Sequence, residues 1–364
     1  MKNFSIEGGR LLVVSDFWIT FVECKLYYQN NNTIMKIFNI LAATLFVATA
    51  CCSCGNNAPK AEEQSALPKV YMTTDISPEG LVKVYEALGR EATGRVAVKI
   101  STGEPGGKNY LKPELIGALV QKVNGTIVEC NTAYEGPRFT TEAHMQVAKD
   151  HGFCDIAPVD IMDAEGDIQI PVKDTTRMKY NIVGSHLANY DFMINLAHFK
   201  GHTMGGFGGV LKNQSIGVAS TIGKVYIHSA GRTTDIEKFW DYTDDQIGFL
   251  ESMAVAAESV HAYFGEGERI LYINVMNNMS VDCDCSSHPA DPVIKDMGIV
   301  ASLDPVALDQ ACVDMVMNMT PEEGNDNAPL VERITTRHGT HIIDHAEKIG
   351  LGSKQYELIS IDEE

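Results

Sequence analysis

Thiol, imidazole and carboxylate groups are concentrated in residues 282–288, which read Asp-Cys-Asp-Cys-Ser-Ser-His. Thiolates and imidazoles are the ligands that zinc and other borderline or soft divalent metals prefer. Cys283 and Cys285 are therefore candidate metal ligands, and His288 is a weaker candidate. The same two cysteines could form a disulfide, since disulfides persist in oxidising compartments. A bridge across one intervening residue is readily reduced, so this alternative implies a thiol redox pair without metal.

A glycine-rich segment, residues 198–213, carries two further imidazoles and two lysines. Five glycines lie between Gly201 and Gly209, and ordering them costs backbone entropy. Such a cost is usually offset where the backbone approaches a ligand closely, so we expect a loop here. His198 and His202 are expected to complete the metal site with the cysteines. The alternative is a packing turn with exposed histidines.

Two other loops supply groups for an anion. Residues 101–109 resemble a phosphate loop, but the spacing is one residue short and Asn109 replaces the Ser or Thr that holds magnesium. This excludes a Walker motif and leaves a looser anion-binding loop or a simple turn. Residues 131–138 combine an aromatic, an acid and an arginine, which could hold a polar ligand or satisfy their own backbone. The residues expected to bind substrate are Lys99, Gly106, Gly107, Lys108, Arg138, Lys212 and Asn213; those expected to catalyse are Lys200, His202 and His228.

The elements that must position these loops alternate between strands and helices. Apolar segments predict strands at residues 70–72, 95–100, 126–130, 168–172, 181–183, 192–197, 270–276 and 299–302. Capping residues and helical spacing predict helices that begin near residues 78, 113, 141, 245 and 305. This order predicts an α/β fold with a mainly parallel sheet and helices on both faces. Ligands in such folds gather at the C-terminal ends of strands, where all four loops lie.

The N-terminal region has the pattern of a lipoprotein signal peptide. Residues 35–50 contain one lysine, then an apolar run that ends in small residues just before Cys51. This predicts lipidation of Cys51, with Cys54 as an alternative register, and a flexible linker over residues 51–68. We interpret residues 1–34 as the product of an upstream start codon and residues 69–364 as the α/β domain. A short core helix is the alternative for the apolar run.

The predicted location is the bacterial cell envelope, with the protein anchored to a membrane by its lipid. No twin-arginine pair precedes the apolar run, which predicts export by the general route. The formal net charge of −19 repels phosphate backbones and excludes nucleic acid as an expected partner. An acidic surface also favours solubility.

Several segments together resemble one protein family. They are residues 99–107, 198–213, 223–228, 282–285 and 298–309. In combination they resemble domain-of-unknown-function family 362 of bacteria and archaea, over about residues 70 to 360. The resemblance implies a fold but no settled activity. Many members carry an inserted iron–sulfur ferredoxin module. This chain has no cysteine between His228 and Cys283 and no Cys-x-x-Cys-x-x-Cys run, so no ferredoxin-type cluster is expected.

We therefore expect a metal-dependent envelope enzyme that acts on a small carboxylate or phosphate. Its cofactor is expected to be a divalent transition metal held by Cys283 and Cys285 with His198 or His202. Isomerisation and redox chemistry are as consistent with these residues as hydrolysis. Two alternatives stay open: a non-catalytic lipoprotein that binds a metal or an anion, and a thiol redox protein without metal.

Overall fold

The structure, a computed structural model, describes residues 6–7, 10–11 and 66–362. Strands β1 (Ile6–Glu7) and β2 (Arg10–Leu11) pair in a unit that spans residues 1–65, and residues 66–364 form a second compact unit. The signal peptide and Cys51 lie outside the described residues. Among the described residues, no helix has the length and apolar character needed to cross a bilayer.

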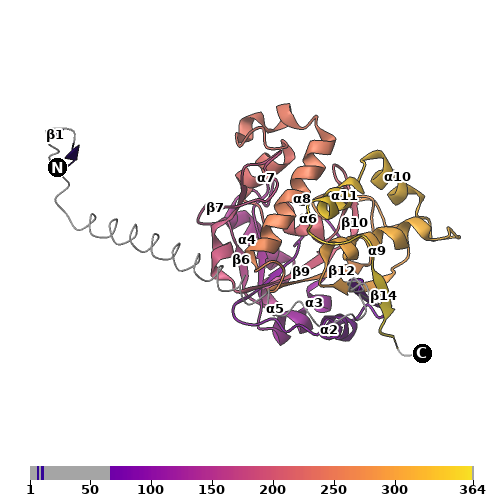
Figure 1. Cartoon of the computed structure of the whole chain (residues 1–364). Helices are drawn as coiled ribbons and strands as arrows, with labels where there is room; N and C mark the ends of the chain where they lie inside the picture. The colour runs from indigo at the N-terminus through magenta and orange to yellow at the C-terminus, as the bar shows by residue number, and fades with distance from the viewer. Residues whose placement is uncertain (1–5, 8–9, 12–65, 363–364) are drawn as a thin grey trace, which may run out of the picture. The chain divides into compact units, whose positions relative to one another are not determined.

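The second unit is built around an eight-stranded sheet (Figure 1). In spatial order its strands are β14 (Glu357–Ser360), β3 (Lys69–Thr73), β13 (Gly298–Ser302), β12 (Ile270–Met276), β9 (Phe192–His198), β4 (Val96–Lys99), β5 (Thr126–Glu129) and β6 (Val159–Ile161). Only β13 in this sheet is reversed, because it pairs antiparallel with both β12 and β3. The predicted α/β fold with a mainly parallel sheet is confirmed.

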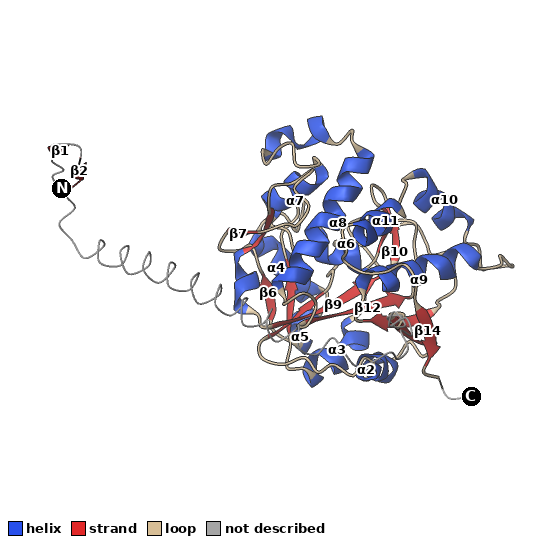
Figure 2. Ribbon diagram, in the orientation of Figure 1, coloured by secondary structure: helices blue, strands red, loops and turns tan. Residues whose placement is uncertain are grey.

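Helices cover both faces of this sheet (Figure 2). One face carries α2 (Pro78–Ala87), α3 (Pro113–Lys122) and α5 (Phe153–Ile156); the other carries α6 (Val210–Ser215), α8 (Gln246–Tyr263), α9 (Pro305–Asn318) and α11 (His341–Lys348). Helices α4 (Thr141–Asp150), α7 (Thr221–His228) and α10 (Ala328–Thr336) and the 3-10 helices η1 (Ser185–Asn189) and η2 (Ile236–Tyr242) complete the unit. Successive strand residues serve opposite cores: Met193 packs in the α8 core and Ile194 in the α2–α3 core.

Helix starts follow the capping signals in the sequence. The Ser77 side chain accepts the Gly80 N–H ahead of Pro78, and Asp304 accepts the N–H groups of Val306 and Ala307 ahead of Pro305. These side chains satisfy backbone donors that the first helical turn leaves unpaired. The predicted helix starts at residues 78 and 305 are thereby confirmed.

Two segments depart from the prediction. The strands expected near residues 168 and 181 form a separate antiparallel pair, β7 (Asp167–Ile170) and β8 (Asn181–Gly184), outside the main sheet. Strand β7 is partly exposed along its length, unlike the strands of a sheet covered on both faces.

The glycine-rich segment, expected to be a loop, instead completes β9 and forms a hairpin of β10 (Lys200–His202) and β11 (Gly206–Gly208) before α6. Gly201 allows the hairpin to pack closely, because a Cβ there would lie 2.2 Å from the Val281 carbonyl oxygen.

Four strands of the sheet end at the same edge. Their last residues are Lys99 in β4, Glu129 in β5, His198 in β9 and Met276 in β12. Strands β4 and β9 are neighbours, yet the next helices along the chain, α3 and α6, lie on opposite faces of the sheet. In open α/β sheets a crevice forms where the chain leaves adjacent strands in this way, and ligands bind there.

Candidate functional site

A cavity of about 330 Å³ lies at this edge of the sheet. Four cationic side chains line it, namely Lys99, Arg138, Lys212 and Lys224, and Glu129 is the one carboxylate among the described residues of its wall. The chain as a whole has a formal net charge of −19. Positive charge is therefore concentrated at this site against the overall balance, which raises the local concentration of anions.

Lys99 and Asn213 join β4 to α6 beneath the cavity. Lys99 is 1% exposed, and its Nζ donates to Asn213 Oδ1 at 3.1 Å and to the Ile100 carbonyl. Asn213 Nδ2 in turn donates to the Lys99 carbonyl at 2.9 Å and to Asn195 Oδ1 at 2.8 Å. Burial lowers the pKa of Lys99 to about 8. These contacts fix the orientation of both predicted substrate-binding residues.

Helix α6 is anchored from the opposite side by Asp309 of α9. The Val210 and Leu211 N–H groups donate to its two carboxylate oxygens at 2.9 and 3.0 Å, and Asn274 Nδ2 donates at 2.8 Å. Burial raises the pKa of Asp309 to about 6 against these hydrogen bonds. The anchored helix presents Lys212 to the cavity.

All three lysines of the cavity wall lack a carboxylate partner among the described residues. Among the described residues, no carboxylate oxygen lies within 4.0 Å of the Nζ of Lys99, Lys212 or Lys224. Burial, then the charges of Lys200 and Lys99, lower the pKa of Lys212 to about 7. A buried charge without a partner is costly. An anion bound in the cavity would offset that cost.

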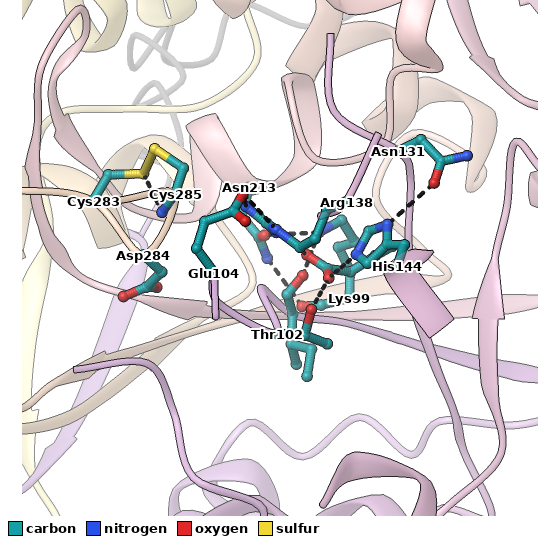
Figure 3. A network of polar contacts seen from close by, with 12 residues as sticks. Lys99, Thr102, Glu104, Asn131, Arg138, His144, Asn213, Cys283, Asp284 and Cys285 are labelled. Atoms are coloured by element: carbon teal, nitrogen blue, oxygen red, sulfur yellow. Dashed lines mark hydrogen bonds and ion pairs between the residues drawn. A yellow bond between two sulfur atoms is a disulfide. The ribbon is translucent and has the colours of Figure 1, made fainter. Parts of the chain in front are cut away.

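Arg138 is held by a buried network (Figure 3). Its Nη2 lies 2.8 Å from Glu104 Oε1, and its Nη1 lies 3.6 Å from Glu129 Oε1. His144 Nε2 approaches Glu129 Oε2 at 2.9 Å. Although burial opposes it, His144 and Arg138 hold the pKa of Glu129 well below its usual range. Arg138 thus holds residues 130–140 at the cavity wall. Its charge is already compensated by Glu104 and Glu129, two acids that the sequence analysis did not single out.

Two neutral imidazoles face the cavity with opposite hydrogen-bonding roles. His202 Nδ1 accepts the N–H groups of Gly205 at 2.8 Å and Met204 at 3.3 Å, which places its proton on Nε2. His228 Nδ1 lies 2.7 Å from the Lys224 carbonyl, so Nδ1 donates and Nε2 keeps a lone pair. Burial lowers the pKa of His228 to about 4 and holds that of His202 well below its usual range. The two rings offer one donor and one acceptor.

Cys283 and Cys285 form a disulfide at the rim of the cavity, with Cα atoms 5.1 Å apart (Figure 3). Cys285 lines the cavity, whereas Cys283 is buried with its sulfur 3.9 Å from Lys212 Nζ. One ring nitrogen of His202 and the two sulfurs all lie within 4.8 Å of one another. The structure therefore brings His202 to the cysteines. While the sulfurs are bonded to each other, they are not metal ligands.

His198 and Lys200 are held by Asp284 instead. His198 Nδ1 lies 2.9 Å from Asp284 Oδ1 and its Nε2 lies 2.6 Å from the Asn277 carbonyl, while Lys200 Nζ lies 2.7 Å from Asp284 Oδ2. Both ring nitrogens of His198 face these oxygen atoms, and His198 is not part of the group formed by His202, Cys283 and Cys285. Although burial opposes it, His198 and Lys200 hold the pKa of Asp284 well below its usual range. Neither side chain lines the cavity.

The remaining candidates lie on the outer side of the loops. A Cβ on Gly106 would lie 3.0 Å from the Ser287 carbonyl oxygen, and one on Gly107 would lie 3.2 Å from that of Ser286. Lys108 forms an exposed ion pair with Asp291 at 2.5 Å, and His288 is exposed. Gly106 and Gly107 allow the loop of residues 100–112 to pack closely against that of residues 277–297. The structure does not bring this group into the cavity.

Comparison with known proteins places the chain in a family without assigning an activity. Residues 96–314 match the family described as Domain of unknown function (DUF362). No curated protein matches the chain. The lactate racemase apoprotein from Thermoanaerobacterium thermosaccharolyticum is 14% identical over 69% of this chain and 57% of its own, with a TM-score of 0.40. A crystal structure of a Thermotoga maritima protein is 13% identical over 65% and 57%, with a TM-score of 0.40. This chain thus spans little more than half the length of either, and neither similarity bears on function.

Proposed function

We propose that this chain, which belongs to the DUF362 family, is an enzyme that binds a small anion in the cavity at the sheet edge and removes and returns a proton on that anion. The observation that carries the proposal is the set of three lysines that line the cavity without a carboxylate partner among the described residues: Lys99 and Lys224, which are buried, and Lys212, which is partly buried. An anionic group supplies the missing charge. The acidic surface of the remaining chain makes this cavity the favoured place for such a group.

The size and lining of the cavity narrow the substrate class. A volume of about 330 Å³ is at the low end for small-molecule sites. One part of the wall is apolar, formed by Met204, Ile216, Phe239 and Trp240. A carboxylate or phosphate with a short apolar body fits both parts of the wall. The apolar part would exclude water from the reacting atoms.

The hydrogen bonds of the two imidazoles indicate which ring would take the proton and which would stabilise the negative charge. His228 Nε2 carries a lone pair and would accept a proton from the substrate, while His202 Nε2–H would donate a hydrogen bond to the negative charge that develops. A bound anion raises the pKa of His228 from about 4 toward neutral pH, which makes it a better base. Removal and return of a proton is isomerisation chemistry.

Binding and proton transfer are tested separately. Calorimetry with inorganic phosphate and with short-chain carboxylates should show at least one ligand whose affinity falls tenfold or more in Lys212→Met. The exposed Lys108→Met is the matched control and should bind as the wild type does. Nuclear magnetic resonance in D2O should then show deuterium entering that ligand, with the exchange lost in His228→Gln while binding persists. Equal affinity in wild type and Lys212→Met, or unchanged exchange in His228→Gln, would reject the proposal.

A second candidate function, a divalent transition metal site formed by Cys283, Cys285 and His202, is favoured by the proximity of their ligand atoms. It requires reduction of the disulfide. It also requires His202 to give up the Gly205 hydrogen bond before Nε2 can offer a lone pair. Elemental analysis should find one more metal per chain in reduced wild type than in oxidised protein or in C283S/C285S. An equal metal content in all three samples would leave the thiol redox pair as the alternative.

The envelope location rests on the sequence pattern around Cys51 alone. We propose that Cys51 is lipidated and that the anchor holds the α/β domain on a bacterial membrane. Metabolic labelling with a radioactive fatty acid should label the wild-type chain and not Cys51→Ser. Equal labelling of the two chains would contradict the anchor.

A further inference from the structure

A second cluster of metal-ligating side chains, none of which lines the cationic cavity, lies between α8 and α11. His341 and His345 are four residues apart on α11 and therefore share one face of that helix. Glu251 of α8 faces them from the neighbouring helix. One ligand atom from each of these three residues lies within 4.8 Å of the other two.

The distances in this cluster fit a shared cation better than direct hydrogen bonds. Glu251 Oε1 lies 3.5 Å from His341 Nε2 and 3.8 Å from His345 Nδ1. Both distances are longer than a good N–H···O hydrogen bond. Two atoms bound to one tetrahedral Zn²⁺ at about 2.0–2.1 Å lie roughly 3.3 Å apart. A small inward movement of the three side chains would complete that geometry.

Two ring nitrogens of the cluster lack partners. His341 Nε2 and His345 Nε2 are buried and make no hydrogen bond in the described part of the chain. The His345 residue as a whole is only 6% exposed. Buried polar atoms without partners are uncommon and indicate a missing ligand, water or ion. Here one of them, His341 Nε2, points toward Glu251.

The surroundings supply the supporting contacts of a metal site. His345 Nε2 makes no hydrogen bond but lies 3.4 Å from Asp174 Oδ2, so a small rotation of the ring would let it donate to that carboxylate while Nδ1 faces the ion. Arg177 Nε holds the other oxygen of Glu251 at 2.8 Å and leaves Oε1 free. His341 also borders a surface cavity of about 360 Å³, which provides an entry path.

We propose that Glu251 Oε1, His341 Nε2 and His345 Nδ1 bind a divalent transition metal ion, with Asp174 orienting His345. Two imidazoles and one carboxylate suit Zn²⁺ and similar ions, and the fourth position is left to water. The ion joins α8 to α11. Metal binding would therefore stabilise the packing of both helices on the sheet by mass action, independently of any ligand in the cationic cavity.

The test uses the full chain, freed of metal by a chelator and kept oxidised so that the Cys283–Cys285 disulfide excludes both sulfurs. Zn²⁺ is titrated by calorimetry into wild type, His341→Gln and His338→Asn. His341 is one-third exposed, so its substitution preserves the fold. His338 is an exposed neighbour with positive φ, which asparagine tolerates, and it serves as the matched control.

The wild type and the control should bind one more Zn²⁺ per chain than His341→Gln, or bind it at least tenfold more tightly. The difference spectrum of Co²⁺-loaded wild type minus His341→Gln should show d–d bands without a thiolate charge-transfer band. Zinc should also raise the midpoint of thermal unfolding of the wild type and leave that of His341→Gln unchanged. Equal stoichiometry and affinity in all three proteins, or a thiolate band in the difference spectrum, would overturn the site.

Discussion

The free energy of unfolding of the wild type should increase as the pH rises above neutral, and replacing Lys99 with methionine should make that increase smaller. Burial lowers the pKa of Lys99 from 10.5 to about 8 in the folded chain. Between these two values the unfolded chain holds more protons at this position than the folded chain. The free energy of unfolding of the wild type therefore increases with pH across this window. At about 1.36 kcal/mol per pKa unit, the full contribution of Lys99 is about 3 kcal/mol.

The measurement is urea unfolding of wild type and Lys99→Met at pH 7.5 and pH 10, followed by circular dichroism. About 2 kcal/mol of the Lys99 contribution falls between these two pH values. The substitution also removes the hydrogen bonds from Nζ to Asn213 and Ile100, but that loss is present at both pH values and cancels in the comparison. The stability increase should thus be about 2 kcal/mol smaller in Lys99→Met.

The loss of Lys99 also changes the pH dependence of stability through Lys212, and this effect has the same sign. Lys99 is one cause of the lowered pKa of Lys212, so removing it also relieves Lys212. A saturating anion in the cavity should reduce the pH dependence of the wild type, because it stabilises the charged lysines. Lys108→Met, at an exposed lysine, is the control, and its free energy of unfolding should increase with pH as that of the wild type does. An equal rise in Lys99→Met and wild type would refute the reasoning that burial destabilises this charge.

Three further substitutions test the framework of the site. Arg138→Gln leaves two buried carboxylates, Glu104 and Glu129, without their cation and should lower the free energy of unfolding by about 3–5 kcal/mol in urea titrations; a loss under about 1 kcal/mol would contradict the network. Asp309→Ala deprives two backbone N–H groups at the start of α6 of their acceptor and should cost about 2–6 kcal/mol, measured in the same way, with weaker anion binding; unchanged stability would show that α6 is held otherwise. Gly201→Ala places a Cβ 2.2 Å from the Val281 carbonyl oxygen and should cost at least about 1–3 kcal/mol by calorimetry; a wild-type midpoint would mean that the hairpin moves freely.

The elements of the fold could be predicted because their signals are local. Ser77 with Pro78, and Asp304 with Pro305, define helix starts within a few residues, and short apolar runs define six of the eight strands of the main sheet. The two edge strands, β6 and β14, were not predicted, because they are only partly buried and lack an apolar run. Strand order is not local. It decides that Lys224 and His228 of α7 face Lys99, and that His144 reaches Glu129. Glu129 did leave a signal, since it closes the strand Thr-Ile-Val-Glu with a charge at the edge where ligands bind.

The glycine-rich segment shows why residue type alone misleads. Its glycines were expected to allow backbone to approach a ligand. Gly201 instead meets the Val281 carbonyl, and a Cβ on Gly209 would lie 2.2 Å from Asp309 Oδ1. Both close approaches join segments of this chain to one another. The number and spacing of glycines are the same in either case, so only the structure separates a ligand contact from a packing contact.

The pairing of β3 sets the order in which the chain can fold during synthesis. Its neighbours are β13 and β14, both from the last fifth of the chain, and Thr73 bonds to Asp362, 289 positions later. At about 5–20 residues per second, β3 waits roughly 15–60 s for that partner after leaving the ribosome. Through that interval its edges are open to other chains. A chain that stops before residue 298 leaves β3 without either neighbour, so loss of the C-terminus acts first on an N-terminal strand.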